Sequence, residues 1–428
     1  MALPPSSPAH TGDRRWRLPV VLALTALIAY LDRINITLAL PLIAEQFAWT
    51  EAELQRNGSL LMSLFYVGYG LSGLLLTPFA ANLGPRRGII IILALASLFT
   101  ALSAFLSQFI LLFAACRIGL GVAEGPHFPL AGMAIRNWFP PNERSRANSI
   151  LFSGIFLAII LGPIVLVPIM HLFGWRAAFL GLAVAGLAVS IPLVTRFVFD
   201  TPAKDRALGD SERLWLAEQH DKEVSAAGTV DVVSGRYPLY LFKQRDFLLL
   251  LLAGTLNNVV SIGLTSWIPT YLTVTLGVPY QQLTWLASLP YVAGLLGLAF
   301  WSQLGDRSNR RGMVAAVGFV LLAALIYIAF TIDNFALTIA AMVGAIFCAS
   351  AYTTAEFAFA QRIIPHQHIA AGIGLFNGVS IVLGGALAPL SASALIGADG
   401  GGFSLWLLIT LAILTAMVMA LLGHLRRY

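Results

Sequence analysis

Residues 117–129 read RIGLGVAEGPHFP, an apolar stretch that carries two opposite charges, Arg117 and Glu124. Seven residues make about two helical turns, so both side chains project from roughly the same face, about 10 Å apart along the axis. A charge at the centre of a bilayer costs roughly 3 kcal/mol on insertion scales. Two charges on one face therefore indicate a water-accessible cavity rather than lipid contact, and they favour transport of an anion together with a proton.

The composition of the whole chain is that of a membrane protein. Of its 428 residues, 58% are hydrophobic and 11% are charged, whereas a soluble protein carries about 25% charged residues. The mean hydropathy is +0.82. Cys116 and Cys348 both lie in apolar segments, without metal-ligand or disulfide spacing around them, so we interpret them as core residues. We expect no metal and no cofactor, with a proton gradient as the energy source.

Twelve apolar segments follow a polar and basic stretch, residues 1–17, which does not have the pattern of a cleavable signal peptide. Each segment is close to the ~20 residues that a spanning helix needs. They are expected at 18–40, 59–80, 88–108, 110–134, 148–171, 176–199, 247–273, 282–302, 313–331, 335–360, 368–390 and 403–423. The sequence therefore predicts an all-α membrane protein with 12 transmembrane helices.

The distribution of Lys and Arg predicts the orientation through the positive-inside rule. With the N-terminus in the cytoplasm, 22 of the 26 Lys and Arg residues fall in cytoplasmic segments. Arg56 and Arg176 fall in outside loops, and Arg33 and Arg117 lie within spans. Both termini are thus expected in the cytoplasm. The same asymmetry explains the net charge of +6 without nucleic-acid binding.

The two halves of the chain repeat one another. LGPRRGIII at 83–91 recurs as GDRSNRRGMV at 305–314, and IRNWFPPNERSRANSI at 135–150 recurs loosely as QRIIPHQHIAAGIG at 361–374. Two pseudo-symmetric six-helix bundles around a central site are typical of secondary transporters. The expected domains are a cytoplasmic tail (1–17), an N-terminal bundle (18–199), a cytoplasmic linker (200–246), a C-terminal bundle (247–423) and a second tail (424–428). In the linker, LGDSERLWLAEQHDKE predicts a short amphipathic helix along the membrane surface.

Several stretches resemble the major facilitator superfamily and, within it, the anion:cation symporter family. They are YLDRINITLALPLI at 30–43, RIGLGVAEGPHFPLAGMAIRNWFPPNERSRA at 117–147, SWIPTYL at 266–272, LPYVAGLLG at 289–297 and the span around Asn377. The resemblance covers nearly the whole chain. It implies alternating access of two bundles to a small organic anion, as in bacterial galactonate, hexuronate, tartrate and phthalate-type permeases and in vesicular glutamate and sialic acid carriers.

Two positions depart from the family pattern. The loop between spans 2 and 3 reads AANLGPRRG, with Ala81 and Asn82 where the superfamily has Asp and a basic residue, whereas the second copy keeps Asp306 and Arg307. The N-terminal half has thus lost a carboxylate of the usual cytoplasmic gate. In the fifth span, galactonate-type relatives often carry a substrate-binding glutamine after a Ser-Gly pair, whereas here Ile155 follows Ser153-Gly154. This departure makes a richly hydroxylated substrate less favourable.

Asp32 and Arg33 lie in the first span, where neighbouring side chains point about 100° apart. They need not pair with each other, and one can pair with the fourth span while the other faces the cavity. One interpretation is a structural ion pair. The interpretation that we favour, which the resemblance also implies, makes Asp32 a proton site and Arg33 an anion contact or its gate.

Arg117 is predicted to hold the substrate carboxylate, because a guanidinium offers two parallel hydrogen bonds and stays charged. The alternative is a permanent bridge to Asp32 or Glu124. Glu124 is predicted to carry the coupling proton. A substrate that engages Arg117 weakens the arginine's hold on the carboxylate, so proton and anion favour each other's binding.

Other residues are weaker candidates. His127 is either a titrating group or a hydrogen-bonded structural residue. Asn257 and Asn258 can bind substrate or bridge helices, and Asn377 has the same two interpretations. The resemblance matches Tyr69 to a substrate-contacting tyrosine and favours a site role for Asn377. Trp267 and Tyr271 are further candidates that hint at a less hydroxylated ligand.

Glu356 in the tenth span has three interpretations: a second proton site, a contact for a cationic group, or a cytoplasmic lock with Arg307 or Arg362. We expect Asp306, Arg307 and Arg362 to form the cytoplasmic gate.

Together, the sequence predicts a proton-coupled symporter that imports a small carboxylate-type anion, as a monomer in a bacterial inner membrane. The alternative is an anion exchanger or uniporter, which does not need two titratable carboxylates. A drug/proton antiporter is disfavoured because Arg117 repels cations. A receptor usually needs a larger soluble domain, and an enzyme needs a nucleophile–base pair or metal cluster, which the spans lack.

Overall fold

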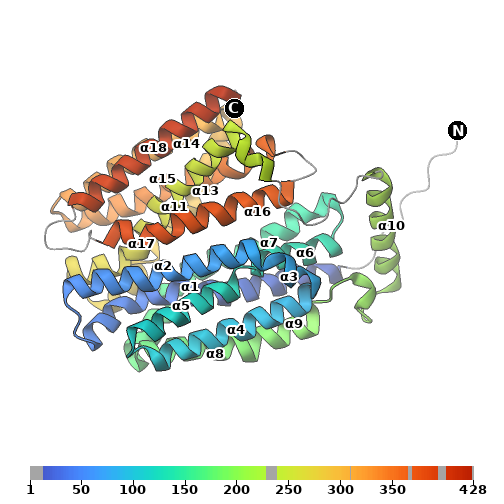
Figure 1. Ribbon diagram of the computed structural model, residues 1–428, viewed down its shortest axis with the longest axis horizontal. Helices are drawn as coiled ribbons and strands as arrows, with labels where there is room; N and C mark the ends of the chain where they lie inside the picture. The colour runs from blue at the N-terminus through green and yellow to red at the C-terminus, as the bar shows by residue number, and fades with distance from the viewer. Residues whose placement is uncertain (1–12, 228–238, 309, 365–368, 394–401, 427–428) are drawn as a thin grey trace.

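The computed structural model describes residues 13–227, 239–308, 310–364, 369–393 and 402–426. These residues form helices and no strand. The helices make two bundles that lie side by side (Figure 1). An all-α fold with two bundles was predicted and is confirmed.

The N-terminal bundle contains the first half of the chain. Its helices are α1 (Arg17–Gln46), α2 (Glu51–Leu75), α3 (Thr77–Asn82), α4 (Pro85–Leu106), α5 (Ile110–Glu124), α6 (His127–Trp138), α7 (Pro141–Phe173), α8 (Trp175–Ala185) and α9 (Ile191–Phe197), with the π-helical turn η2 (Gly186–Ser190) between α8 and α9. A 3₁₀ turn, η1 (Arg14–Trp16), precedes α1.

The C-terminal bundle contains the second half. Its helices are α11 (Arg245–Thr270), α12 (Leu283–Leu286), α13 (Leu289–Ser308), α14 (Arg311–Thr331), α15 (Phe335–Ile363), α16 (Ile369–Ser380), α17 (Ala386–Ala392) and α18 (Gly402–Arg426), with the short turns η5 (Tyr271–Thr275), η6 (Tyr280–Gln282) and η8 (Ile381–Gly385). The linker contributes η3 (Pro202–Lys204), α10 (Asp210–Ala227) and η4 (Leu239–Lys243).

Eleven helical segments of the described chain are long and apolar enough to cross a membrane. The predicted span at 110–134 is the exception, because it is divided into α5 and α6, neither of which is long enough alone. Pro126 has no backbone N–H and therefore interrupts the hydrogen-bond ladder. The break places Glu124 at the last residue of α5 and His127 at the first residue of α6.

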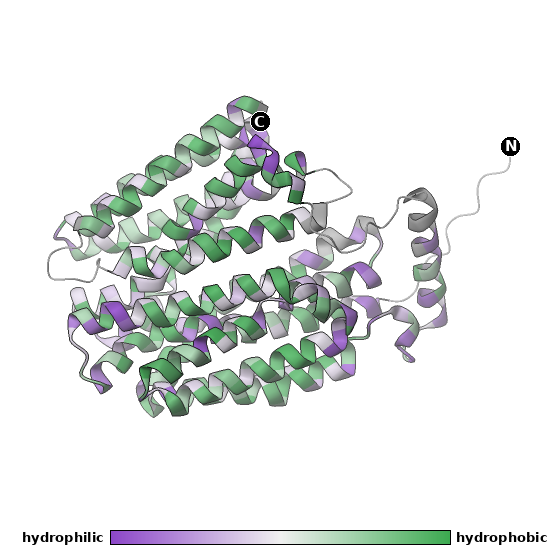
Figure 2. Cartoon of the chain, viewed as in Figure 1, coloured by the Kyte–Doolittle hydropathy of each residue, from purple (hydrophilic) through white to green (hydrophobic). Residues whose placement is uncertain are grey.

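Hydrophobic residues cover the outer surfaces of both bundles, whereas hydrophilic residues gather at the helix ends and on α10 (Figure 2). Large apolar side chains such as Leu111, Phe105 and Phe403 are exposed. Such an apolar surface is unfavourable in contact with water, but it is compatible with the hydrocarbon chains of a bilayer. The chain is a multi-pass membrane protein.

The bundles are joined at the end opposite α10, which we call the distal end. The Tyr280 hydroxyl donates to the backbone carbonyl of Leu38 at 2.8 Å, and the Ser288 hydroxyl donates to that of Ile160 at 3.0 Å. Toward the other end, which we call the α10 end, the two bundles diverge (Figure 1). The α10 end is the end that the Lys and Arg distribution predicts to be cytoplasmic.

At the α10 end, where Ala81 and Asn82 provide no charge, the carboxylate of Asp200 lies at the N-terminus of α4. Asp200, which follows α9, accepts a hydrogen bond from the backbone N–H of Arg86 at 3.1 Å. Gly84, with φ of 81°, leads the chain into α4, and the Asp200 carboxylate lies against it. A negative charge at a helix N-terminus is favourable, so Asp200 caps α4 from the segment that follows α9.

The linker helix α10 is attached to the N-terminal bundle by a charge network at Arg15. The Arg15 guanidinium is 1% exposed; its Nε and Nη2 donate to Glu143 at 2.9 and 3.0 Å, and its Nη1 donates to Glu212 of α10 at 2.9 Å. Its Cζ also lies 4.9 Å from the ring centroid of Trp215. The backbone N–H groups of Arg14 and Arg15 donate to the Glu212 carboxylate.

The sequence predicts that Leu214, Leu216 and Ala217 form an apolar face on the membrane surface. In the structure Leu216 packs into the core of the N-terminal bundle, whereas Leu214 is exposed. The helix crosses the ends of the bundle helices (Figure 1). Helix α10 therefore makes its apolar contact with the N-terminal bundle, through the side chain of Leu216.

Replacing Arg15 by alanine should destabilise the protein. Removing one partner of a buried ion pair leaves the other unpaired and costs roughly 3–5 kcal/mol. We expect the Arg15→Ala protein in detergent to unfold at a clearly lower temperature than wild type. The matched control is Arg17→Ala, because Arg17 is an exposed arginine two positions away. Equal melting temperatures for the two variants would contradict this account of the network.

Candidate functional site

The candidate site is an ion pair between α1 and the end of α5. The Nη2 atom of Arg33 donates to Oε2 of Glu124 at 3.2 Å, and the two side chains are 11% and 2% exposed. Arg33 therefore pairs with the fourth predicted span, one of the arrangements that the sequence left open. The break at Pro126 places Glu124 where α5 ends.

Three aromatic rings surround the Arg33 guanidinium. Its Cζ lies 4.3 Å from the centroid of Tyr69, 4.4 Å from that of Tyr30 and 5.1 Å from that of Phe65. Cation–π attraction stabilises a guanidinium in such a setting without neutralising it. The guanidinium therefore keeps its charge and its capacity to donate to an anion.

Asp32 points to a different side of α1 from Arg33. Its carboxylate accepts hydrogen bonds from the Thr100 hydroxyl on α4 and, at 2.8 Å, from the side-chain amide of Asn35. It is 5% exposed. The ~100° step between neighbouring residues of a helix explains why the two charges separate.

Arg117 is fully buried behind this ion pair. Its Nε donates to the backbone carbonyl of Leu61 at 3.4 Å, its Cζ lies 5.1 Å from the centroid of Phe65, and it interacts electrostatically with Asp32 and Glu124. Among the described residues its Nη1 has no hydrogen-bond partner. Of the two arginines, Arg33 is thus the more accessible to an anion, and a substrate contact of Arg117 stays a prediction.

The four side chains form a balanced cluster of two cations and two anions. Glu124 interacts with both arginines, and Asp32 interacts with Arg117 and Glu124. Hydrogen-bonding capacity remains unused within the described part of the chain: Oε1 of Glu124 and Nε of Arg33 are buried without a partner. A buried polar atom without a partner is costly, so this cluster is the candidate binding site.

Glycines allow the close approach of α2 and α5 that holds the cluster together. A Cβ atom on Gly121 would lie 2.1 Å from the carbonyl oxygen of Phe65, and one on Gly125 would lie 2.0 Å from the Ser72 hydroxyl. Only a residue without a side chain fits such contacts. The aromatic rings of α2 therefore reach Arg33, which projects from α1.

Polar residues of the C-terminal bundle were further candidates. The ring of Tyr66 of α2 lies against Gly385 of η8, so the two bundles meet at this level. Oδ1 of Asn257 accepts from the Ser261 hydroxyl at 3.0 Å, within α11. Asn258 lies against Gly384 of η8, and Asn377 is partly buried in α16. Their substrate contacts stay predictions.

Trp267 and Tyr271 belong to packing at the distal end. The indole Nε1 of Trp267 donates to the backbone carbonyl of Pro389 at 2.9 Å, and its ring lies against Gly58. The rings of Tyr271 and Phe330 pack edge to face, 4.7 Å apart. The structure gives both aromatic residues a structural partner and does not bring them to the Arg33 cluster.

Glu356 forms no ion pair with any side chain that the structure describes. It is partly buried on α15, near Tyr352, with which it interacts electrostatically. Arg307 and Arg362 are exposed. The side chain of Asp306 lies outside the described part of the chain, as do residues 365–368 of the second repeat. The predicted gate therefore stays a prediction.

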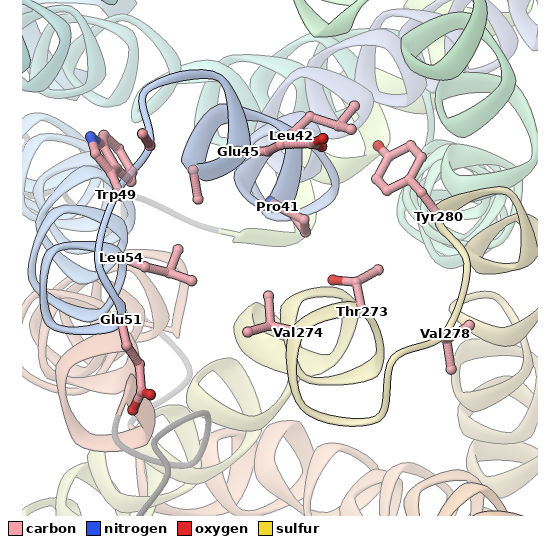
Figure 3. Close-up of a pocket in the computed structure, with 12 residues that line it drawn as sticks. Pro41, Leu42, Glu45, Trp49, Glu51, Leu54, Thr273, Val274, Val278 and Tyr280 are labelled. Carbon is pink, nitrogen blue, oxygen red and sulfur yellow. The ribbon is translucent and has the colours of Figure 1, made fainter.

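A pocket of about 440 Å³ opens between the bundles at the distal end. Figure 3 shows Glu45 and Glu51 at its rim, opposite Thr273, Val274 and Tyr280. Among the described residues, no Lys or Arg side chain lines this pocket. An acidic, partly apolar pocket is unsuited to hold an anion, so we do not place the binding site there.

No group of three or more His, Cys, Asp or Glu side chains with metal-binding geometry occurs among the described residues. The Arg33 cluster is a charged site in the interior of the spans, and it contains guanidinium and carboxylate groups.

Comparison with known proteins identifies the family. The sequence profile of the Major Facilitator Superfamily matches residues 22–283 and 271–427. The chain belongs to the major facilitator superfamily.

Its relatives include transporters of organic anions. A probable sulfoacetate transporter of Cupriavidus necator is 31% identical over 322 residues, which cover 73% of this chain and 72% of the relative. The D-galactonate transporter of Escherichia coli is 24% identical over 424 residues, covering 94% and 93%. The crystal structure of a D-xylose-proton symporter has the same fold, with a TM-score of 0.72 at 17% identity over 95% of this chain and 97% of that one. Proteins of this superfamily are transporters, and this chain is not an enzyme.

The four charged residues of the cluster were predicted as candidates, but three residues that contact them were not. Tyr30 and Phe65 pack on Arg33, and Thr100 bonds Asp32. A signal for the aromatic residues was available: Tyr30 precedes Arg33 by three positions, and Phe65 precedes Tyr69 by four, spacings that share a helix face. The partner of Asp32 on α4 has no such local signal.

Replacing Gly125 by alanine should disrupt this transporter. The new Cβ would overlap the Ser72 hydroxyl and approach the carbonyl oxygen of Tyr69 at 2.5 Å, so α2 and α5 must separate. Overpacking of this kind costs roughly 1–3 kcal/mol. We expect a lower melting temperature and strongly reduced transport.

The matched control is Gly132→Ala, since a Cβ at Gly132 on α6 meets nothing within 4 Å. This variant should melt and transport as wild type does. If Gly125→Ala behaved like Gly132→Ala, the close approach of α2 and α5 would not be needed.

Proposed function

We propose that the protein is a proton-coupled symporter that imports a small organic anion by alternating access, in a bacterial inner membrane. The observation that carries this proposal is the bond between Arg33 and Glu124. One carboxylate oxygen of Glu124 is bound to the arginine, and the other is buried without a partner among the described residues.

Anion binding and protonation are linked through this bond. A carboxylate or sulfonate that binds Arg33 competes with Glu124 for the guanidinium. Glu124 is then left as a buried carboxylate with a weaker counter-charge, a state that is costly in a medium of low polarity. Taking up a proton relieves that cost, so the anion and the proton stabilise each other's binding.

The charge balance of the cluster supports the same coupling. Without substrate, Arg33 and Arg117 offset Asp32 and Glu124. An anion adds one negative charge, and a proton on Glu124 or Asp32 restores neutrality. An anion exchanger needs no second titratable carboxylate, which is why we place symport ahead of exchange.

The substrate that we propose carries a carboxylate or sulfonate and few hydroxyl groups. A guanidinium binds either group through two parallel hydrogen bonds. Three aromatic rings around Arg33 leave mostly apolar surface beside the charge. Ile155 stands where galactonate-type relatives often carry a polar side chain. The relative named as a probable sulfoacetate transporter fits this substrate class.

Uptake by purified protein in liposomes tests the proposal. We expect accumulation of a small anion from a labelled panel (sulfoacetate, a hexuronate and galactonate) when the outside is more acidic than the inside. A protonophore should abolish the accumulation. Exchange that ignores the gradient would instead establish the exchanger alternative.

Replacing Glu124 by glutamine should separate proton coupling from anion movement. Glutamine keeps the size of the side chain but cannot carry the proton, so gradient-driven accumulation should be lost while counterflow exchange of the anion remains. The control is Glu45→Gln, because Glu45 lies exposed at the distal pocket. Loss of counterflow as well would show that Glu124 does more than bind the proton.

A further inference from the structure

A second, smaller pocket lies within the N-terminal bundle. Its volume is about 20 Å³, and α1, α4, the junction of α5 and α6, and the junction of α8 and η2 enclose it. Among its lining residues are Asp32, Ser97, Glu124, His127 and Gly186. Both candidate proton carriers therefore border one space.

Several polar atoms at or beside this pocket lack hydrogen-bond partners within the described chain. His127 is 1% exposed, and neither of its ring nitrogens is hydrogen-bonded. Oε1 of Glu124 is buried and equally unpaired. Ser190 Oγ, in the adjoining π-turn, is a third buried atom without a partner. Such groups are rare in folded proteins, and a bound water is a common reason for them.

One water molecule fits this pocket in size and in chemistry. A buried water needs about 10–15 Å³ and two to four polar partners. The pocket offers a carboxylate oxygen of Glu124, a ring nitrogen of His127 and the Asp32 carboxylate along its wall. Asp32 keeps its bonds from Thr100 and Asn35, and a carboxylate oxygen can accept more than one hydrogen bond.

Helix α1 separates this pocket from the aromatic side on which an anion reaches Arg33. Glu124 touches both sides: Oε2 accepts from Arg33, and Oε1 is the unpaired atom. The charged groups around His127 are the carboxylates of Asp32 and Glu124, which line the pocket with it, and the guanidinium groups of Arg33 from α1 and Arg117 from α5, which act on these residues. Glu124 therefore connects the pocket to the anion side at Arg33.

We propose that this pocket is a proton-relay site, in which a water molecule held by His127 passes the proton between Glu124 and Asp32. This inference rests on the proposed proton coupling. Protonated Glu124 gives its proton to the water, and the water gives one of its own protons to the Asp32 carboxylate. Only O–H bonds form and break, and one negative charge moves from Asp32 to Glu124. His127 stays neutral and positions the water.

Replacing His127 by phenylalanine tests the relay, because phenylalanine keeps a ring of similar size without any hydrogen-bonding nitrogen. We expect gradient-driven accumulation to fall about tenfold or more, while counterflow of the anion continues. His127→Gln should restore much of the accumulation, since an amide can hold the water. Gly132→Ala, on the same helix, should accumulate the anion normally.

A second variant fills the pocket without touching a titratable residue. A Cβ at Gly186 would lie 2.1 Å from the Ser97 hydroxyl, so Gly186→Ala narrows the pocket. We expect the same loss of accumulation with preserved counterflow. Gly181→Ala is the matched control on α8, because a Cβ there meets nothing within 4 Å.

The outcomes separate the relay from the proposed function. If wild type itself shows no gradient-dependent accumulation, the proton coupling fails, and the relay fails with it. If wild type is gradient-dependent and His127→Phe accumulates normally, the relay alone is wrong. If His127→Phe and His127→Gln lose accumulation and counterflow to the same extent, His127 is a packing residue, and the relay is overturned.

Discussion

The bond between Arg33 and Glu124 is the constraint to which the rest of the N-terminal bundle conforms. A lone charge in the interior of the spans is costly, so each arginine needs a carboxylate nearby. Three features of the sequence bring the pair together. Pro126 ends α5 at Glu124, glycines at 121 and 125 let α2 approach α5, and the rings of α2 then enclose the arginine. Without the pair, these features would only weaken the helices.

The charge network at the α10 end has a different physical character. The Arg15 guanidinium donates hydrogen bonds to both Glu143 and Glu212. It also lies near the ring of Trp215. Such a network fixes α10 to the N-terminal bundle. In the Arg33 cluster, by contrast, buried donors and acceptors remain unpaired within the described chain. A network in which the donors and acceptors are paired resists rearrangement. A network with unpaired groups can exchange partners, and the transport cycle that we propose requires such an exchange.

The sequence predicts the architecture of two helical bundles, but it does not predict which arginine bonds Glu124. Apolar segments of ~20 residues predict the bundles because the bilayer sets their length. The spacing of Arg117 and Glu124 correctly places both near one site, but it says nothing of α1, and Arg33 is the residue that bonds Glu124. That choice depends on how α1 is rotated against α5, which no local pattern records. Likewise, no local pattern predicts the partner of the one polar atom of Trp267. Its indole Nε1 donates to the carbonyl of Pro389, which lies far away in the chain.

In the symport that we propose, the positions of Asp32 and Arg33 on α1 let one helix serve both the proton and the anion. Asp32 and Arg33 are neighbours, yet the helix turns them toward different elements: the carboxylate toward Thr100 of α4, and the guanidinium toward Tyr69 of α2. Glu124 is the group that interacts with both sides. In the symport that we propose, an anion that binds Arg33 takes the guanidinium away from Glu124 and so changes the free energy of protonating that carboxylate. The linkage between anion binding and protonation then arises from competition for one guanidinium, and alternating access carries both ligands across.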